Sequence, residues 1–148
     1  MSFQLNWTIE GEKQLSRVLS GLRDDIKNLQ APFSESAKKL IKVFSQDSFS
    51  TQGQVINERW ARLSPYTVAQ KARNGYPPDP LIRTGAMKKS FRSVVQTDSA
   101  TIYNTAEYFK YHQSNQPRKK IPRRVMMKLT EEQKTMVVRI FQKHLFKK

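Results

Sequence analysis

A short basic segment in the last third of the chain has the clearest chemical potential. Five positive charges fall within seven residues: Arg118, Lys119, Lys120, Arg123 and Arg124. Such a segment is typical of a loop that binds a polyanion or an acidic protein surface. Pro122 within it lowers the conformational entropy that ordering would cost. A solvated loop with no partner is the alternative, and no helix-turn-helix or zinc-finger pattern indicates recognition of DNA bases.

Residue types that catalyse reactions or bind metals are sparse. The only histidines are His112 and His144, and the chain has no cysteine. His112 lies near two tyrosines, but no nucleophile or acid accompanies it, which favours a surface or hydrogen-bonding role over a catalytic base. There is no acidic cluster with metal-ligand spacing, no glycine-rich phosphate loop and no nucleophile elbow. We therefore expect no enzyme activity, no metal and no cofactor; a metal-dependent nuclease would be the most plausible enzyme.

Charge is distributed unevenly along the 148 residues. The net charge is +15, with 27 basic and 12 acidic residues, and residues 110–148 hold 12 of the basic residues but only 2 of the acidic ones. This asymmetry indicates a polyanionic or acidic partner, or a basic surface with no specific target. The first ten residues lack the pattern of a secretory signal, and no apolar run reaches membrane-span length. We expect one domain, residues 1–148, made in the cytoplasm and not associated with a membrane.

The elements that must position these residues follow from hydropathy patterns. Alternation over residues 3–9 predicts a half-buried strand. Two helical stripes follow, one from Leu15 to Leu29 and one from Phe33 to Phe44, the second beginning near Pro32 and fading over residues 45–54. Ser64-Pro65 predicts the start of a short helix that ends at Asn74-Gly75. Residues 76–80, with three prolines, should form an extended connector.

The second half of the chain predicts a hairpin and a last helix. Residues 86–90 should form a short turn or helix, residues 91–97 and 101–105 a β-hairpin, and residues 106–113 a short helix. Residues 114–120 should be an exposed loop, and residues 125–129 are ambiguous between strand and helix. Thr130 to Gln133 has capping-box spacing and opens a helix with an apolar stripe from Met136 to Leu145. The expected fold is α+β, a small antiparallel sheet, with residues 124–128 as a candidate fourth strand, packed against two N-terminal helices and the C-terminal helix.

Four segments carry a family resemblance. They are WARLS at 60–64 with Thr67 and Lys71 after it, PLIRTGAM at 80–87, the end of the hairpin with Tyr108 and YHQ at 111–113, and IPRRVMMKL at 121–129. In this order and spacing the chain resembles the phage virion-morphogenesis and tail-completion family, the proteins similar to the G protein of phage Mu. Departures are Ser114-Asn115-Gln116, where the family commonly has glycines, and Met126, where it often has an aromatic residue.

The resemblance implies a structural subunit of the phage virion. Such a protein would sit at the head–tail junction, as a neck, tail-completion or tail-terminator subunit, and form a homo-oligomeric ring. Its partners would be neighbouring head-completion or connector proteins and tail proteins, with non-specific contact to the genomic DNA. The alternative is a basic nucleic-acid-binding protein without sequence specificity.

The residues of the four segments also make physical sense without the family. Trp60 and Leu63 are three apart and should share one face, and Leu81 should anchor the proline connector to the core. Gly85 after Thr84 indicates a positive φ or a close backbone approach. The residues expected to be structurally important in the four segments are Trp60, Leu63, Leu81, Thr84, Gly85, Tyr108, His112 and Pro122.

Overall fold

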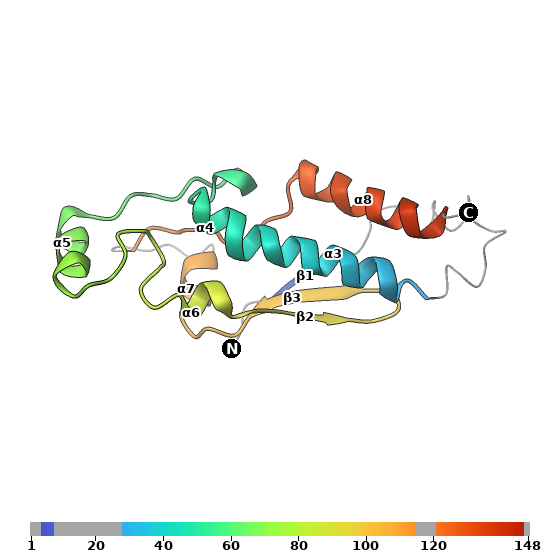
Figure 1. Ribbon diagram of the computed structural model, residues 1–148, viewed down its shortest axis with the longest axis horizontal. Coiled ribbons are helices and arrows are strands. Elements are labelled where there is room, and N and C mark those ends of the chain that lie inside the picture. The colour runs from blue at the N-terminus through green and yellow to red at the C-terminus, as the bar shows by residue number, and fades with distance from the viewer. Residues whose placement is uncertain (1–3, 8–27, 115–120, 147–148) are drawn as a thin grey trace.

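The computed structural model describes the backbone of residues 4–7 and the full residues 28–114 and 121–146. The predicted helix stripe from Leu15 lies almost wholly outside the described residues, as does most of the predicted loop 114–120. Within the described part the chain forms an elongated α+β structure, with a sheet along one side and helices on top of it (Figure 1). The predicted fold class is confirmed.

The sheet has three antiparallel strands in the order β1-β3-β2. β1 spans Gln4–Trp7, β2 Phe91–Val95 and β3 Ala100–Asn104, so the predicted first strand and hairpin are both confirmed. The first strand pairs with the last, Gln4 opposite Tyr103, while β2 pairs with β3 from Phe91 opposite Asn104. The central strand β3 is therefore hydrogen-bonded to the N-terminal strand β1 on one side and to β2 on the other.

The long helix α3, Gln30–Lys42, lies along the sheet and carries the predicted apolar stripe. Pro32 is in its first turn, where a missing N–H costs nothing. The helical run ends at Ser50, inside the predicted range 45–54. It passes from α3 through a π-helical turn, Val43–Asp47, into α4, Ser48–Ser50. Because a π turn is wider than an α turn, it brings Phe44 and Phe49, five residues apart, closer to one face, and both are buried.

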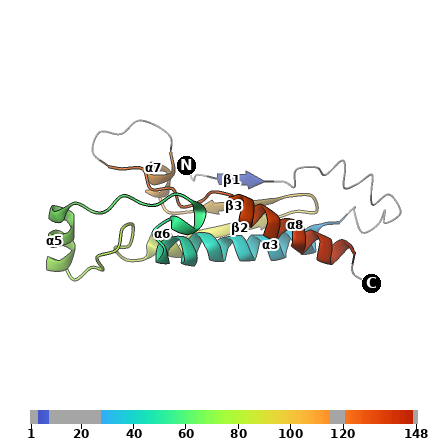
Figure 2. The ribbon, with the colours of Figure 1, turned by 90° about the horizontal axis from the view of Figure 1, so that it is seen from above.

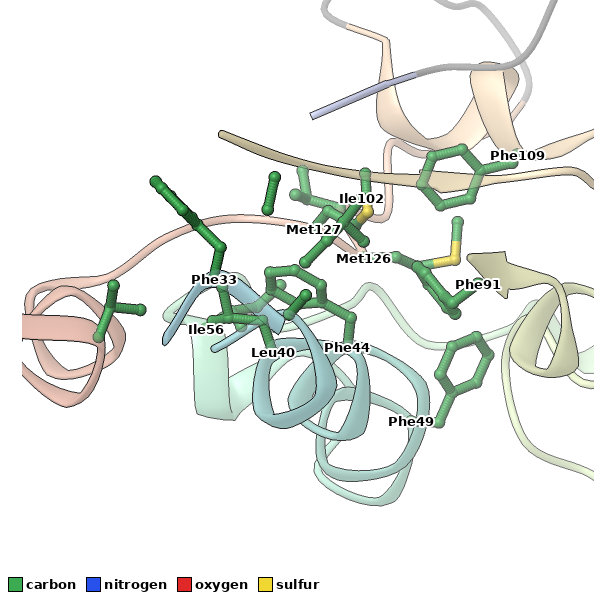
Figure 3. Close-up of a cluster of buried hydrophobic side chains, with 14 of the residues drawn as sticks. Phe33, Leu40, Phe44, Phe49, Ile56, Phe91, Ile102, Phe109, Met126 and Met127 are labelled. Carbon is green, nitrogen blue, oxygen red and sulfur yellow. The ribbon is translucent and has the colours of Figure 1, made fainter. Parts of the chain in front are cut away.

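The core lies between α3 and the sheet and is rich in aromatic rings (Figure 3). Phe91 of β2 packs edge-to-face on Phe109, with ring centroids 5.8 Å apart, and its ring lies 6.4 Å from that of Phe44. Leu40 and Ile102 are fully buried between them. Edge-to-face pairs add to the free energy gained by burial alone, so these rings fix how α3 sits on the sheet.

The last helix, α8, spans Glu131–Leu145 and lies over α3 (Figures 1 and 2). The predicted capping box is confirmed: Gln133 N–H donates to Thr130 Oγ1, and Gln133 Oε1 accepts from Thr130 N–H. Phe141 meets Phe33 edge-to-face at 4.8 Å, and His144 Nε2 lies 2.7 Å from Glu35 Oε2. This contact with His144, opposed by desolvation and helped by Lys143 and Lys39, lowers the pKa of the Glu35 carboxyl.

Residues 121–129 form neither the strand nor the helix that their composition allowed. Four consecutive residues of this segment are buried, from Arg124 to Met127, but none of them pairs with a strand. The candidate fourth strand is therefore wrong. The segment crosses the core as irregular chain, and its backbone groups bond to side chains instead.

A projecting arm, residues 61–85, extends from one end of the body (Figure 1). It carries α5, Pro65–Arg73, whose predicted Ser64 cap is confirmed, since Ser64 Oγ accepts from Thr67 N–H at 3.2 Å. The predicted connector 76–80 is not uniformly extended, because the chain turns at Pro80 and Leu81, where Leu81 has φ 63°. The arm returns to the body through α6, Ala86–Lys89.

Among the described residues, no helix is long and apolar enough to cross a membrane.

Trp60 fastens the start of the arm to the core. It is 4% exposed, packs edge-to-face on Phe49 at 5.1 Å, and donates its Nε1–H to the carbonyl of Val125 at 2.7 Å. Gly53, at φ +83°, lies beneath it, and a Cβ there would lie 2.6 Å from the indole and collide with the Glu58 carbonyl. Only glycine fits this approach.

Truncation of Trp60 tests this packing. Trp60→Ala should lower the free energy of unfolding by about 3–5 kcal/mol, because it removes a buried ring and leaves a cavity. Trp60→Phe should cost about 1–3 kcal/mol, since the ring stays but the Val125 carbonyl loses its donor. Chemical denaturation measures both, and near-native stability of Trp60→Ala would show that the indole serves an interface instead of the core.

Candidate interaction groove

The four sequence segments that carry the family resemblance converge on one groove between the arm and α7, Phe109–Gln113. The cavity measures about 410 Å³. We call it the motif groove and define it by these lining residues: Leu63, Thr67, Gln70, Lys71, Asn74, Tyr76, Leu81, Ile82, Arg83, Met87, Tyr108, His112 and Arg124. Residues up to 61 positions apart in sequence thus share one surface, and each of the four segments contributes at least one of them.

Lys71 ties the two sides of the arm together at the edge of the groove. Its side chain is 9% exposed, and Nζ donates to the carbonyls of Asp79 at 2.6 Å and Ile82 at 2.7 Å. Burial is the main cause that lowers the pKa of Lys71, and the charges of Arg124 and Arg83 add to it, while Asp79 opposes it. The lysine therefore holds the turn at Pro80 and Leu81 against α5.

Arg124 connects the arm to residues 121–129. It is 5% exposed, and its guanidinium donates through Nε to Ala61 O at 2.9 Å and through Nη2 to Arg62 O at 3.3 Å. Burial lowers the pKa of Arg124, although arginine stays charged at any ordinary pH. Arg124 is thus already bonded within its own subunit, and its predicted contact with a partner ring or DNA stays a prediction.

Gln113 and Asn104 also bond to backbone groups, in the core next to the segments that form the groove. The Gln113 amide donates to Met127 O at 2.6 Å and accepts from the N–H groups of Met126 and Met127 at 2.9 and 3.2 Å. Asn104 is fully buried, donates to Met87 O at 2.7 Å and accepts from Ala106 N–H at 2.9 Å. An amide offers a donor and an acceptor together, so each side chain replaces a strand partner that the irregular chain lacks.

The other basic residues predicted to contact a partner are placed differently from Arg124. Arg123 is exposed, with Nε 3.2 Å from Gln113 O, while Arg118, Lys119 and Lys120 lie outside the described residues. Their contact with a partner ring or DNA stays a prediction. Pro122, between them, is exposed.

The remaining predicted structural residues are less buried than Trp60. Leu63 and Leu81 are half-buried at the groove, and Tyr108 is exposed. The positive φ of Gly85 is confirmed at 81°, and Thr84 Oγ1 accepts from Ala86 N–H at 3.4 Å. Leu81, which was expected to anchor the connector to the core, is partly buried and packs against the core cluster. Its backbone is left-handed, a conformation that costs a non-glycine residue about 1–2 kcal/mol.

His112 is half-buried and lines the groove, and no acidic side chain stands among the described residues that line it. The described part of the chain also holds no group of three residues suited to a metal ion. Sequence reasoning missed the clamping roles of Lys71, Asn104 and Gln113. The available signal was that all three are polar residues within the family segments.

A comparison with models of protein families finds a match to the phage virion morphogenesis family over residues 11–146. This confirms the family expected from the four segments, while the closer likeness to the G protein of phage Mu stays an expectation. No curated protein and no solved structure gives a significant match to the chain.

Arg124 and its neighbour Arg123 provide a matched pair of substitutions. Arg124→Ala should lower the free energy of unfolding by about 2–4 kcal/mol, because the carbonyls of Ala61 and Arg62 lose a charged donor. Arg123→Ala should change it by less than about 1 kcal/mol, as for an exposed side chain. Denaturation curves measure both, and equal small effects would show that Arg124 does not hold the arm.

Gln113 allows a second test. Gln113→Leu should cost about 2–4 kcal/mol, because it leaves one carbonyl and two N–H groups in the core without their partner. Gln113→Glu should be less stable at neutral pH than at mildly acidic pH, since only the protonated carboxyl can still donate to Met127 O. Stability of Gln113→Glu that is the same as wild type at every pH would contradict the clamp.

Proposed function

The chain belongs to the phage virion morphogenesis family, and we propose that it is a structural subunit of the virion's head–tail junction. A protein of this family has a role in phage structure or assembly. The finer proposal is a neck, tail-completion or tail-terminator subunit that forms a ring and joins or closes head and tail. The protein would be made in the host cytoplasm and would catalyse no reaction.

The projecting arm is the observation that carries this proposal. The only buried residue of α5 is Lys71, while Tyr66 and Val68 are 78% and 40% exposed. A helix that hides almost none of its surface in its own subunit is suited to contact another one. A closed ring needs two different faces of each subunit to meet, and an arm at one end of an elongated body supplies one of them.

A nucleic-acid-binding protein without sequence specificity is the second candidate. The net charge of +15 favours it. Two of the cations that contribute to that charge, Lys71 and Arg124, are almost fully buried and already donate to backbone carbonyls. Nucleic-acid binding also does not explain why the chain belongs to a virion morphogenesis family, so we prefer the virion subunit.

The location of the protein in particles tests the proposal. Phage that lack it should accumulate separate heads and tails, and images of complete particles should place it in a cyclic arrangement around the axis that joins head to tail. Single copies on the capsid surface, or joined and infectious particles without the protein, would contradict the proposal.

Neutral substitution of the basic segment separates the two candidates. Arg118, Lys119, Lys120 and Arg123 would be replaced together, with Arg124 kept because it holds the arm. Docking on a neighbouring protein predicts unjoined heads and tails and weak binding to DNA before and after the change. A DNA-binding protein instead predicts tight binding by the wild type that falls steeply with added salt and with the substitutions.

A further inference from the structure

Positive side chains line the motif groove and no acidic side chain of the described residues does, although the Asp79 carboxylate stands near Lys71. Lys71, Arg83 and Arg124 all line it. Arg83 is exposed and lies over the Tyr76 ring, 4.7 Å from the centroid. Backbone carbonyls accept from Lys71 and Arg124 but carry no net charge. The groove is therefore an open, partly apolar surface with a local excess of cations, which suits a carboxylate.

The described residues contain one adjacent pair of acids, at the start of α8. Both Glu131 and Glu132 are exposed, and the side chain of Glu131 is 90% exposed. It forms an ion pair with Lys134 at 3.4 Å, an exposed contact that contributes little. The pair lies at the start of α8, which packs on α3, while the groove is lined by residues of the arm, α6, α7 and Arg124.

Other acids of the described residues are less suited to this role. Glu35 is paired with His144, Glu58 with Lys128, and Asp79 is next to Lys71. The remaining ones stand singly. The start of α8 is thus the part of the chain whose charge best complements the groove.

We propose that, in the ring of the proposed function, the motif groove of one copy receives Glu131 and Glu132 of a second copy. The inference rests on that proposed function and names the contact within it. The groove and the acidic pair are different surfaces of one subunit. When the groove of one copy binds the acidic pair of a second copy, the first copy's acidic pair and the second copy's groove stay available for further copies. Repetition of such a heterologous contact around an axis closes a ring.

The most direct experiment is cross-linking in assembled phage particles. The natural chain has no cysteine, so Arg83→Cys combined with Glu132→Cys introduces the only thiols of this protein. A short bifunctional thiol reagent should then join copies into a ladder of dimers, trimers and larger species on a denaturing gel. Arg83→Cys combined with Asp98→Cys, an exposed turn residue of the hairpin, is the matched control and should give no ladder.

Charge reversal then tests whether the opposite charges hold the contact. Arg83→Glu alone, or Glu131→Lys with Glu132→Lys, should each reduce the yield of joined particles at least about tenfold, as expected when like charges face each other. All three changes together should restore part of it, because Lys71 and Arg124 stay positive. Lys38→Glu and Asp98→Lys, exposed residues on other surfaces, are the controls and should leave the yield unchanged.

Clear outcomes overturn the inference. Absence of the ladder, a ladder equal to that of the control pair, or cross-links from Arg83→Cys to a different virion protein would each exclude this contact. Reversals that leave the yield unchanged, or that the triple change does not partly restore, would exclude charge as its basis. If imaging still places a ring of the protein at the head–tail junction, the proposed function stands and only the contact fails.

Discussion

The structure depends on one constraint: backbone groups that leave water must find partners even where the chain forms no helix or strand. Residues 121–129 cross the core without forming a helix or strand, and the first and last residues of the arm are irregular too. Side chains supply the missing partners. Trp60 and Gln113 donate hydrogen bonds to backbone carbonyls of this segment. Arg124, which belongs to the segment, donates to backbone carbonyls of the arm. All of these bonds are shorter than 3.5 Å. The bonds of Trp60 and Gln113 are buried, so the loss of either side chain leaves a buried group unpaired, which costs more than the bond itself contributes.

This constraint shapes the surface as well as the core. Lys71 fixes the turn of the arm against α5, and Arg124 fixes the arm's first residues against the core, so the groove between them has a defined form. The same two side chains bring positive charge to the groove, and burial lowers the pKa of each. A clamp built from cations thus produces both a rigid arm and a surface that attracts carboxylates. An uncharged clamp such as Gln113 would do only the first.

The net charge of +15 consequently overstates what is available to a polyanion. Of the five cations in the basic segment, Arg124 serves the fold, and Arg123 is exposed to solvent with a contact to Gln113 O. A run of like residues in sequence is therefore not one surface. Neighbouring arginines have opposite roles here, because an irregular chain turns successive side chains to different sides, one toward Ala61 and one outward.

Sequence alone determined the elements that follow from local physics. Period-two alternation, the apolar stripes of α3 and α8, the Ser64 and Thr130 caps, and the positive φ of Gly85 depend on a few neighbouring residues, and each was predicted correctly. The four family segments and their order could also be recognised from the sequence alone. Tertiary structure alone decided that helix α3 continues through a π turn, that Leu81 takes a left-handed backbone conformation, and that residues 121–129 stay irregular. It also decided that the four segments meet in one groove. These outcomes depend on contacts between residues far apart in sequence, such as Trp60 with Val125 and Arg124 with Ala61, which no local pattern encodes.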